Sequence, residues 1–212
     1  MQFIVILQYY LVTNMSDTFK TINTSTEGIY KEKGSKFLSF AIPVRHVDEV
    51  KEIVKEYRKR FFDARHVCYA YMLGHEHKEF RANDDGEPSG TAGRPNLGQI
   101  NSRELTDILV IVVRYFGGIL LGTGGLVVAY KEATADALNQ AEIIEKTVDE
   151  LFKINFDYIL MNDVMRIIKE TNPQIVNQTF DNQCTMELSI RKQDAPALIS
   201  KLEKIIGLVI EK

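Results

Sequence analysis

The sequence predicts an α+β protein built from two domains. Three observations support this fold class. The segment HVDEVKEIVKEYRKRFF (46–62) has the periodicity of an amphipathic helix and stands between strand-like runs. The run ILVIVV (108–113) has the composition of a strand that is buried on both faces. After residue 146 the alternation of strands and helices begins again, so we expect a domain boundary there.

The first domain is expected to cover residues 15–146, and it opens with strands. Residues 18–43 favour two or three strands, which Gly28 and Gly34 punctuate. In the helix of residues 46–62, valines and aromatic residues form one stripe. Its last turn holds three basic residues, which match the helix dipole, so we interpret them as a solvated helix end.

The rest of the first domain alternates strands with a glycine-rich surface stretch. Residues 65–74 alternate aromatic and smaller side chains, as expected of a strand. The stretch 83–95 is polar and rich in glycine, so we expect it at the surface. The strand at 108–113 then leads into a helix from about residue 125 to 140, where apolar side chains recur at helical spacing.

Residues 147–212 are expected to form a second, smaller domain. Four strand-like segments and two helical segments follow one another in the order βαββαβ. This order is typical of the split βαβ, ferredoxin-like plan. The expected elements are strands at 150–158 and on both sides of 181–182, helices at 160–171 and 195–206, and a strand at 207–211.

Composition excludes several classes of protein. Hydrophobic residues make up 45% and charged residues 26% of the 212 residues, which is ordinary for a globular protein. The net charge is −3, and neither half carries a basic excess. Contact with RNA would therefore need a local patch of charge.

The cysteines and the N-terminus bear on location. Cys68 and Cys184 fall in different halves, so we expect free thiols in a reducing, cytoplasmic compartment. Residues 1–14 contain an apolar run of about ten residues, short of the roughly 20 that span a bilayer. We interpret them as an upstream extension before Met15, with an extra strand or a packing arm as the alternative. No membrane partner, cofactor or metal is expected.

The segment RYFGGILLGTGG (114–125) is the most informative local feature. Its glycines and Thr123 stand between a buried strand and a helix, where backbone N–H groups can bind an anion. Arg114 at the end of the strand can add a charge-assisted contact. The segment lacks the lysine of a Walker loop and the spacing of a dinucleotide motif. Alternatively, the glycines only permit a tight turn.

The segment NDDGEPSGTAGRP (83–95) is the second candidate. Asp84, Asp85 and Glu87 could hold a divalent cation through oxygen ligands, but a surface turn is the favoured interpretation. Ser89 is not in the context of a nucleophile elbow, so a catalytic serine is disfavoured. Arg94 carries a guanidinium with the fork geometry that suits phosphate. Neither arginine, Arg94 or Arg114, is expected in the apolar core.

Three ordered blocks identify a family resemblance. ARHVCYAYMLG (64–74), RANDDGEPSGTAGRP (81–95) and LTDILVIVVRYFGGILLGTGGLVVAY (105–130) closely resemble the signature blocks of the Impact/YigZ family. The resemblance runs from near Gly28 to Ala141. The C-terminal part resembles the small ferredoxin-like domain of bacterial members, although its motifs are less distinctive.

The resemblance implies both a fold and a role. It implies a first domain like a ribosomal-protein domain, also seen as domain IV of elongation factor G. The second domain would resemble domain V of that factor. It also implies an association with translation, because eukaryotic relatives regulate initiation by interfering with the activator of an amino-acid-starvation kinase.

Two functional hypotheses follow. The favoured one is a binding protein that contacts RNA, the ribosome or a translation factor. The other is an enzyme, or a protein that binds a small phosphorylated ligand, with the same glycine-rich loop and the acidic loop. The candidate residues for either role are Arg65, His66, Asn83, Asp84, Asp85, Glu87, Ser89, Gly90, Thr91, Arg94, Arg114, Gly117, Gly118, Gly122, Thr123, Gly124 and Gly125.

Overall fold

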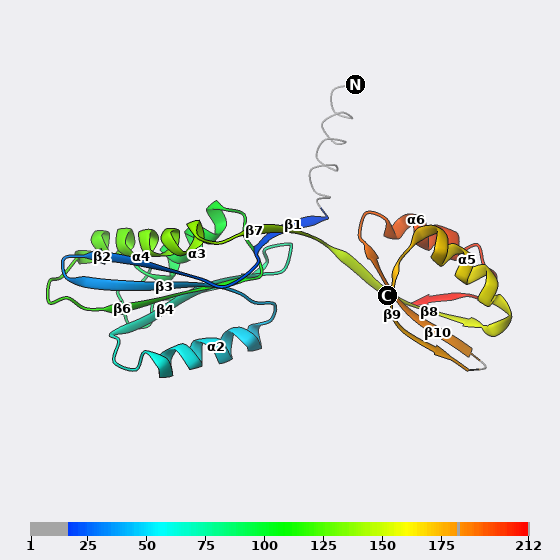
Figure 1. Ribbon diagram of the computed structural model, residues 1–212, viewed down its shortest axis with the longest axis horizontal. Helices are drawn as coiled ribbons and strands as arrows, with labels where there is room; N and C mark the ends of the chain where they lie inside the picture. Colours follow the sequence, from blue (N-terminus) through cyan, green and yellow to red (C-terminus); the bar gives the residue numbers. More distant parts are fainter. Residues whose placement is uncertain (1–16, 182, 212) are drawn as a thin grey trace, which may run out of the picture. The chain divides into compact units, whose positions relative to one another are not determined.

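The computed structural model describes residues 17–181 and 183–211, which divide into two compact units (Figure 1). One unit consists of residues 19–146, and the other combines residues 147–211 with Asp17 and Thr18. Each unit has its own sheet and its own hydrophobic core, which confirms the predicted α+β class. The segment 1–14, predicted to be an upstream extension, lies outside the described residues.

The first unit is built on a five-stranded antiparallel sheet. Its strand order is β2-β3-β6-β4-β5. The strands are β2 (Thr26–Glu32), β3 (Ser35–Pro43), β6 (Ile108–Tyr115), β4 (His66–Leu73) and β5 (Glu79–Asn83). The central strand, β6, is the predicted apolar run, and all six residues of 108–113 are fully buried.

Helices cover both faces of this sheet, and they lie on opposite sides of it in Figure 1. On one face α2 (Val47–Arg60) packs over a core that includes Val67 and Tyr71 of β4. On the other face α3 (Gly93–Ser102) and α4 (Gly122–Asn139) cover Cys68 and Ala70. Because both faces of the sheet are covered, residues 108–113 of the central strand β6 are apolar on both faces and do not alternate with polar residues.

The predicted helices agree with α2 and α4, but α3 was missed. Its sequence, GRPNLGQINS, contains two glycines and a proline, which are poor helix formers. The stretch 83–95 is also less exposed than expected, because Glu87, Thr91 and Gly93 are buried. The prediction of a surface loop throughout 83–95 was therefore wrong.

The second unit has the predicted βαββαβ order. Its antiparallel sheet has the strand order β11-β8-β10-β9, in which the two inner strands are the first and third of the motif. Its elements are β8 (Asp149–Asp157), α5 (Met161–Thr171), β9 (Gln174–Phe180), β10 (Gln183–Arg191), α6 (Ala195–Leu202) and β11 (Val209–Glu211).

Two further strands, β1 (Thr18–Ile22) and β7 (Ile143–Thr147), pair with each other in a separate two-stranded sheet.

Two smaller expectations can be compared with the structure. Cys68 and Cys184 are both free, as predicted, and both are buried. Within the described residues, no helix combines the length and the apolar character needed to cross a membrane.

Candidate functional site

A pocket of about 510 Å³ opens in the first unit, where the ends of two strands meet the start of α4. His66 begins β4 and Arg114 lies near the end of β6, and the antiparallel register places these two residues opposite each other. Residues of both glycine-rich stretches line the pocket. Its lining consists of Arg65, His66, Glu87, Pro88, Arg114, Phe116, Leu120, Leu121, Gly122, Thr123 and Leu126.

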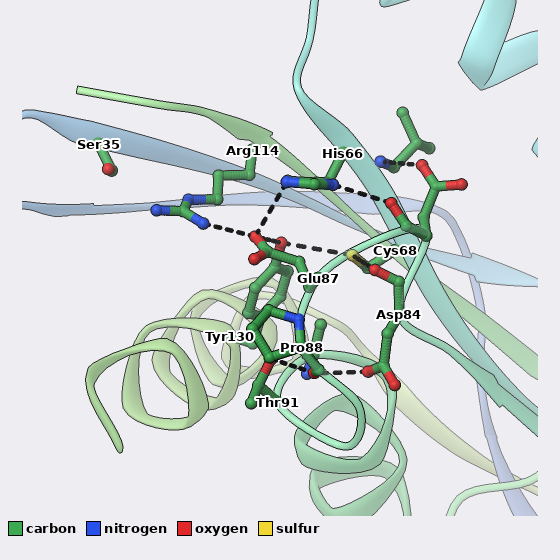
Figure 2. Close-up of polar contacts among 12 residues, drawn as sticks. Ser35, His66, Cys68, Asp84, Glu87, Pro88, Thr91, Arg114 and Tyr130 are labelled. Atoms are coloured by element: carbon green, nitrogen blue, oxygen red, sulfur yellow. Dashed lines mark hydrogen bonds and ion pairs between the residues drawn. The ribbon is translucent and has the colours of Figure 1, made fainter. Parts of the chain in front are cut away.

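A buried ion pair contributes to the lining of the pocket, and Figure 2 shows its two side chains. The guanidinium of Arg114 donates through Nη1 to Oε1 of Glu87 at 2.6 Å. Arg114 is only 5% exposed and Glu87 only 8% exposed. The expectation that Arg114 lies outside the apolar core was therefore wrong. Glu87 supplies the counter-charge that makes this burial tolerable.

Two aromatic rings lie close to the buried guanidinium of Arg114. The Cζ atom of Arg114 lies 5.5 Å from the ring centre of Phe37 and 5.6 Å from that of Phe116. A cation is attracted to the face of an aromatic ring at such distances. Phe37 belongs to the core, whereas Phe116 is half exposed and lines the pocket.

One donor of Arg114 has no partner. Its Nε is fully buried and makes no hydrogen bond to any described residue. A buried N–H without an acceptor costs free energy, on the order of 1–3 kcal/mol. Because this Nε is buried, a ligand oxygen in the pocket does not reach it, and the part of Arg114 that lines the pocket is the rest of its side chain.

Tyr130 connects the ion pair to the core. Its hydroxyl lies 2.9 Å from Oε1 of Glu87 and donates to it, and Cys68 Sγ lies 3.3 Å from the same hydroxyl. Burial raises the pKa of Tyr130 well above its ordinary value, so the phenol keeps its proton and remains a donor. Burial raises the pKa of the Cys68 thiol as well, which makes that cysteine a poor nucleophile.

His66 is held in one orientation beside the ion pair. Its Nδ1 lies 2.8 Å from the backbone oxygen of Asp85. A carbonyl oxygen only accepts, so Nδ1 carries the proton. In the neutral ring Nε2 then holds the lone pair, and it lies 3.8 Å from Oε1 of Glu87. His66 can therefore accept a hydrogen bond from a ligand in the pocket.

The start of α4 adds a positive partial charge. No described side chain caps this helix, and the residue before Gly122 is Leu121, which has no polar side chain. The first backbone N–H groups of a helix need acceptors from outside it, and they favour an anion. Gly122 and Thr123 bring this helix start to the pocket, whose lining also includes Arg65.

The three carboxylates of the acidic loop do not converge. Asp84 accepts hydrogen bonds from the backbone N–H groups of Gly90, Ala92 and Gly93, at the start of α3. Asp85 accepts from the N–H of Val67 and pairs with Arg58. Glu87 pairs with Arg114. Within the described ranges, no group of three or more histidine, cysteine or acidic side chains is placed to hold a metal ion.

The pKa of Asp84 reflects this capping role. Burial alone would raise it, but the N–H groups of Gly90, Gly93 and Ala92 outweigh burial and hold it below its ordinary value. Asp84 therefore acts as a cap for a helix that has no capping side chain of its own.

The structure brings together six of the predicted site residues at the pocket. These are Arg65, His66, Glu87, Arg114, Gly122 and Thr123. The other eleven lie outside its lining, and they are Asn83, Asp84, Asp85, Ser89, Gly90, Thr91, Arg94, Gly117, Gly118, Gly124 and Gly125. Ser89 and Arg94 are exposed, whereas Thr91 is buried.

Sequence reasoning missed the apolar wall and the tyrosine. Phe116, Leu120 and Leu121 lie among the glycines of 114–125, and apolar residues in a glycine-rich turn were a usable signal. Tyr130 lies in the helix that was predicted from about residue 125 to 140, and that prediction gave it no role in the site. Nothing in its helical spacing indicates that its hydroxyl meets a buried glutamate from another loop.

The fold defines an α+β protein of two compact units, with a pocket in the first unit. Residues 33–138 match the Impact N-terminal domain. The chain is 30% identical over 183 residues to the IMPACT family member YvyE of Bacillus subtilis, covering 86% of this chain and 84% of the relative. It is 33% identical over 181 residues to an IMPACT family member of Haemophilus influenzae, covering 84% and 88%. The chain therefore belongs to the Impact family.

A solved structure agrees with this assignment. The crystal structure of a hypothetical protein superposes with a TM-score of 0.73 at 27% identity. The superposition covers 93% of this chain and 98% of that one, so the similarity extends over both units.

Proposed function

We propose that this protein is a translation-associated binding protein of the cytoplasm, and that its pocket binds a phosphate group of RNA. The ribosome and a translation factor are the larger partners that we consider. The observation that carries the proposal is a pocket whose lining combines Arg65 with the start of α4, a helix start that no described side chain caps. The resemblance of the two domains, residues 15–146 and 147–212, to domains IV and V of elongation factor G belongs to the same proposal.

The charge of the pocket favours a single phosphate over a polyphosphate. Arg114 and Glu87 neutralise each other. Two sources of positive charge remain. Arg65 carries one full charge, and the N-terminus of α4 carries a partial charge equivalent to roughly half an elementary charge. This sum matches the single negative charge of a phosphodiester better than it matches a nucleoside triphosphate.

The apolar residues of the pocket lining suit the base of a nucleotide. Phe116 and Leu120 are exposed at the pocket, and Leu126 lies deeper. A nucleobase is flat and can stack on an aromatic ring, with a contribution of about 1–3 kcal/mol for each base. A phosphate at the helix start and a base against Phe116 would together use the charged and the apolar parts of the lining.

Arg65→Ala tests the proposal without disturbing the buried ion pair, because Arg65 is exposed. Ribosomal particles are collected by sedimentation from mixtures with the purified protein at several salt concentrations. We expect weaker co-sedimentation and a salt dependence that is flatter by roughly 0.7–0.9 for the lost phosphate contact.

Arg94→Ala is the matched control, because Arg94 is an exposed arginine outside the pocket lining. We expect it to sediment with ribosomal particles like the parent. If Arg65→Ala also behaves like the parent, the pocket does not bind RNA.

A small phosphorylated ligand is the second candidate. The volume of about 510 Å³ favours it, since small-molecule sites span roughly 300–1,000 Å³. Thermal unfolding in the presence of nucleoside monophosphates tests this candidate. Stabilisation that is lost in Arg65→Ala, together with unchanged ribosome association, would place it ahead of RNA.

A further inference from the structure

A basic groove lies on the face of the first sheet that α2 covers. It has a volume of about 310 Å³. Alternation along β4 separates the groove from the pocket: Tyr69 and Tyr71 point to the α2 face, whereas His66 and Cys68 point to the face of α3 and α4. The basic groove is lined by Val47, Val50, Lys51, Val54, Lys55, Arg58, Tyr69, Tyr71 and Arg81.

Positive charge borders the groove on two sides. Lys51, Lys55 and Arg58 are spaced by four and three residues on α2, so they form a stripe along one side of the helix. Arg81 stands on β5, directly opposite Tyr71 of β4. Within residues 17–181 and 183–211, no acidic side chain lines this groove.

Two of the four cations are uncompensated. Lys51 pairs with Asp48, and Arg58 pairs with Asp85. In the described part of the chain, Lys55 and Arg81 have neither an ion-pair partner nor a hydrogen-bonded side-chain partner, and both are exposed. Of the three basic residues that the sequence analysis interpreted as a solvated helix end, only Arg58 lines this groove.

The floor of the groove is aromatic and apolar. Tyr69 is partly exposed, and its ring packs beside the valines of α2. Tyr71 is buried, and burial raises its pKa, so it contributes a neutral surface. A flat aromatic surface between rows of cations is the arrangement that single-stranded nucleic acids use, with bases on the rings and phosphates on the cations.

We infer that the basic groove binds single-stranded RNA. Lys55 and Arg81 contact phosphates, and the ring of Tyr69 stacks with a base. Stacking favours RNA over an acidic peptide, since a peptide would use the cations but not the ring. The inference rests on the proposed function in taking RNA as the ligand, but it concerns a different surface.

The test measures the binding of a short fluorescein-labelled single-stranded RNA of mixed sequence by fluorescence anisotropy, between about 50 and 200 mM KCl. The double variant Lys55→Ala/Arg81→Ala is expected to weaken binding and to flatten the salt dependence by about 0.7 for each of the two lost contacts. Tyr69→Leu is expected to weaken binding roughly tenfold at constant salt, the scale of one lost base stack.

Lys31→Ala/Lys131→Ala is the matched control. It removes the same charge from exposed positions on β2 and α4, and β2 is the edge of the sheet opposite β5. We expect it to bind RNA with an affinity and a salt slope close to those of the parent. Because Lys55 and Arg81 are exposed, their double variant keeps the test valid even if Tyr69→Leu is destabilised.

Three outcomes would overturn the inference. The first is a Lys55→Ala/Arg81→Ala variant that binds like the parent. The second is a parent that does not bind the RNA. The third is displacement of the RNA by polyglutamate at equal charge combined with no effect of Tyr69→Leu, which would indicate a surface for acidic protein. Loss of binding in Arg65→Ala but not in the groove variants would retain the proposed function and reject the groove.

Discussion

The two glycine-rich stretches of the first unit make different contacts with the rest of the fold. In residues 83–93, the carboxylates of Asp84, Asp85 and Glu87 each bind a different part of the fold. In residues 116–125, most side chains are exposed, and no described side chain caps the start of α4. The first stretch holds the fold together, whereas the second leaves backbone donors available.

The difference teaches that glycine content does not by itself indicate an anion site. A glycine-rich turn exposes backbone N–H groups, and these bind whichever acceptor is near. In the first stretch the acceptor is Asp84, eight and nine residues before the N–H groups of Ala92 and Gly93. The second stretch, FGGILLGTGG, contains no carboxylate. The N–H of Gly117 donates to Ser35 Oγ, whereas the first N–H groups of α4 meet no capping side chain among the described residues.

The largest expected effect is that of Glu87→Ala, which removes the ion pair between the first stretch and Arg114. It leaves Arg114 buried without a counter-charge, and removing one partner of a buried pair costs about 3–5 kcal/mol. Urea denaturation should show a loss of unfolding free energy on this scale. Glu56→Ala, at an exposed position on α2, is the control and should change it by less than about 0.5 kcal/mol. A loss below about 1 kcal/mol in Glu87→Ala would mean that the ion pair contributes little.

Asp84→Ala is expected to have the next largest effect. It removes the acceptor of three backbone N–H groups at the start of α3, for which we expect a loss of about 2 kcal/mol. Amide hydrogen exchange should rise first in residues 90–96, because those donors and the first turn of α3 lose their cap. Unchanged exchange there would show that α3 does not depend on Asp84.

The contribution of Asp84 to the free energy of unfolding should depend on pH. Its pKa in the folded protein is lowered, so the stabilisation is complete above the unfolded pKa of about 4 and is lost as the pH falls through the lower folded value. The difference in unfolding free energy between the parent and Asp84→Asn should be constant from about pH 7 to pH 5 and shrink below about pH 4. A difference that persists unchanged at about pH 3 would contradict the capping role of the carboxylate.

The smallest expected effect is that of Gly124→Ala, in the second glycine-rich stretch (116–125). Gly124→Ala places a Cβ where no atom lies within 4 Å, in a helical conformation, so we expect a gain of up to about 1 kcal/mol. Gly117→Ala contrasts with it, because its Cβ would lie 1.9 Å from the carbonyl carbon of Gly34 and should destabilise the protein. Thermal unfolding of the two variants separates these outcomes. A destabilised Gly124→Ala would show that the helix start is more tightly packed than we infer.

The prediction of secondary structure succeeded where local periodicity and packing agree. The helix of residues 46–62 and the strand of 108–113 were identified because their apolar spacing matches the surfaces that they bury. The helix α3 was missed because its glycines and proline disfavour a helix locally, and its stability comes from Asp84 and from packing against α4. The sequence placed the candidate site on two loops. It did not show which polar groups of those loops are bound within the fold and which are free to bind a ligand.

The sequence by itself determined the α+β class, the βαββαβ order of the second unit and the Impact family, because these depend on periodicity and on contiguous motifs. Only the tertiary structure decided that Arg114 is buried with Glu87, and that Lys55 and Arg81 face one groove. The physical reason is the distance along the chain. Glu87 and Arg114 are 27 residues apart, and the free energy of a buried charge depends on such distant partners.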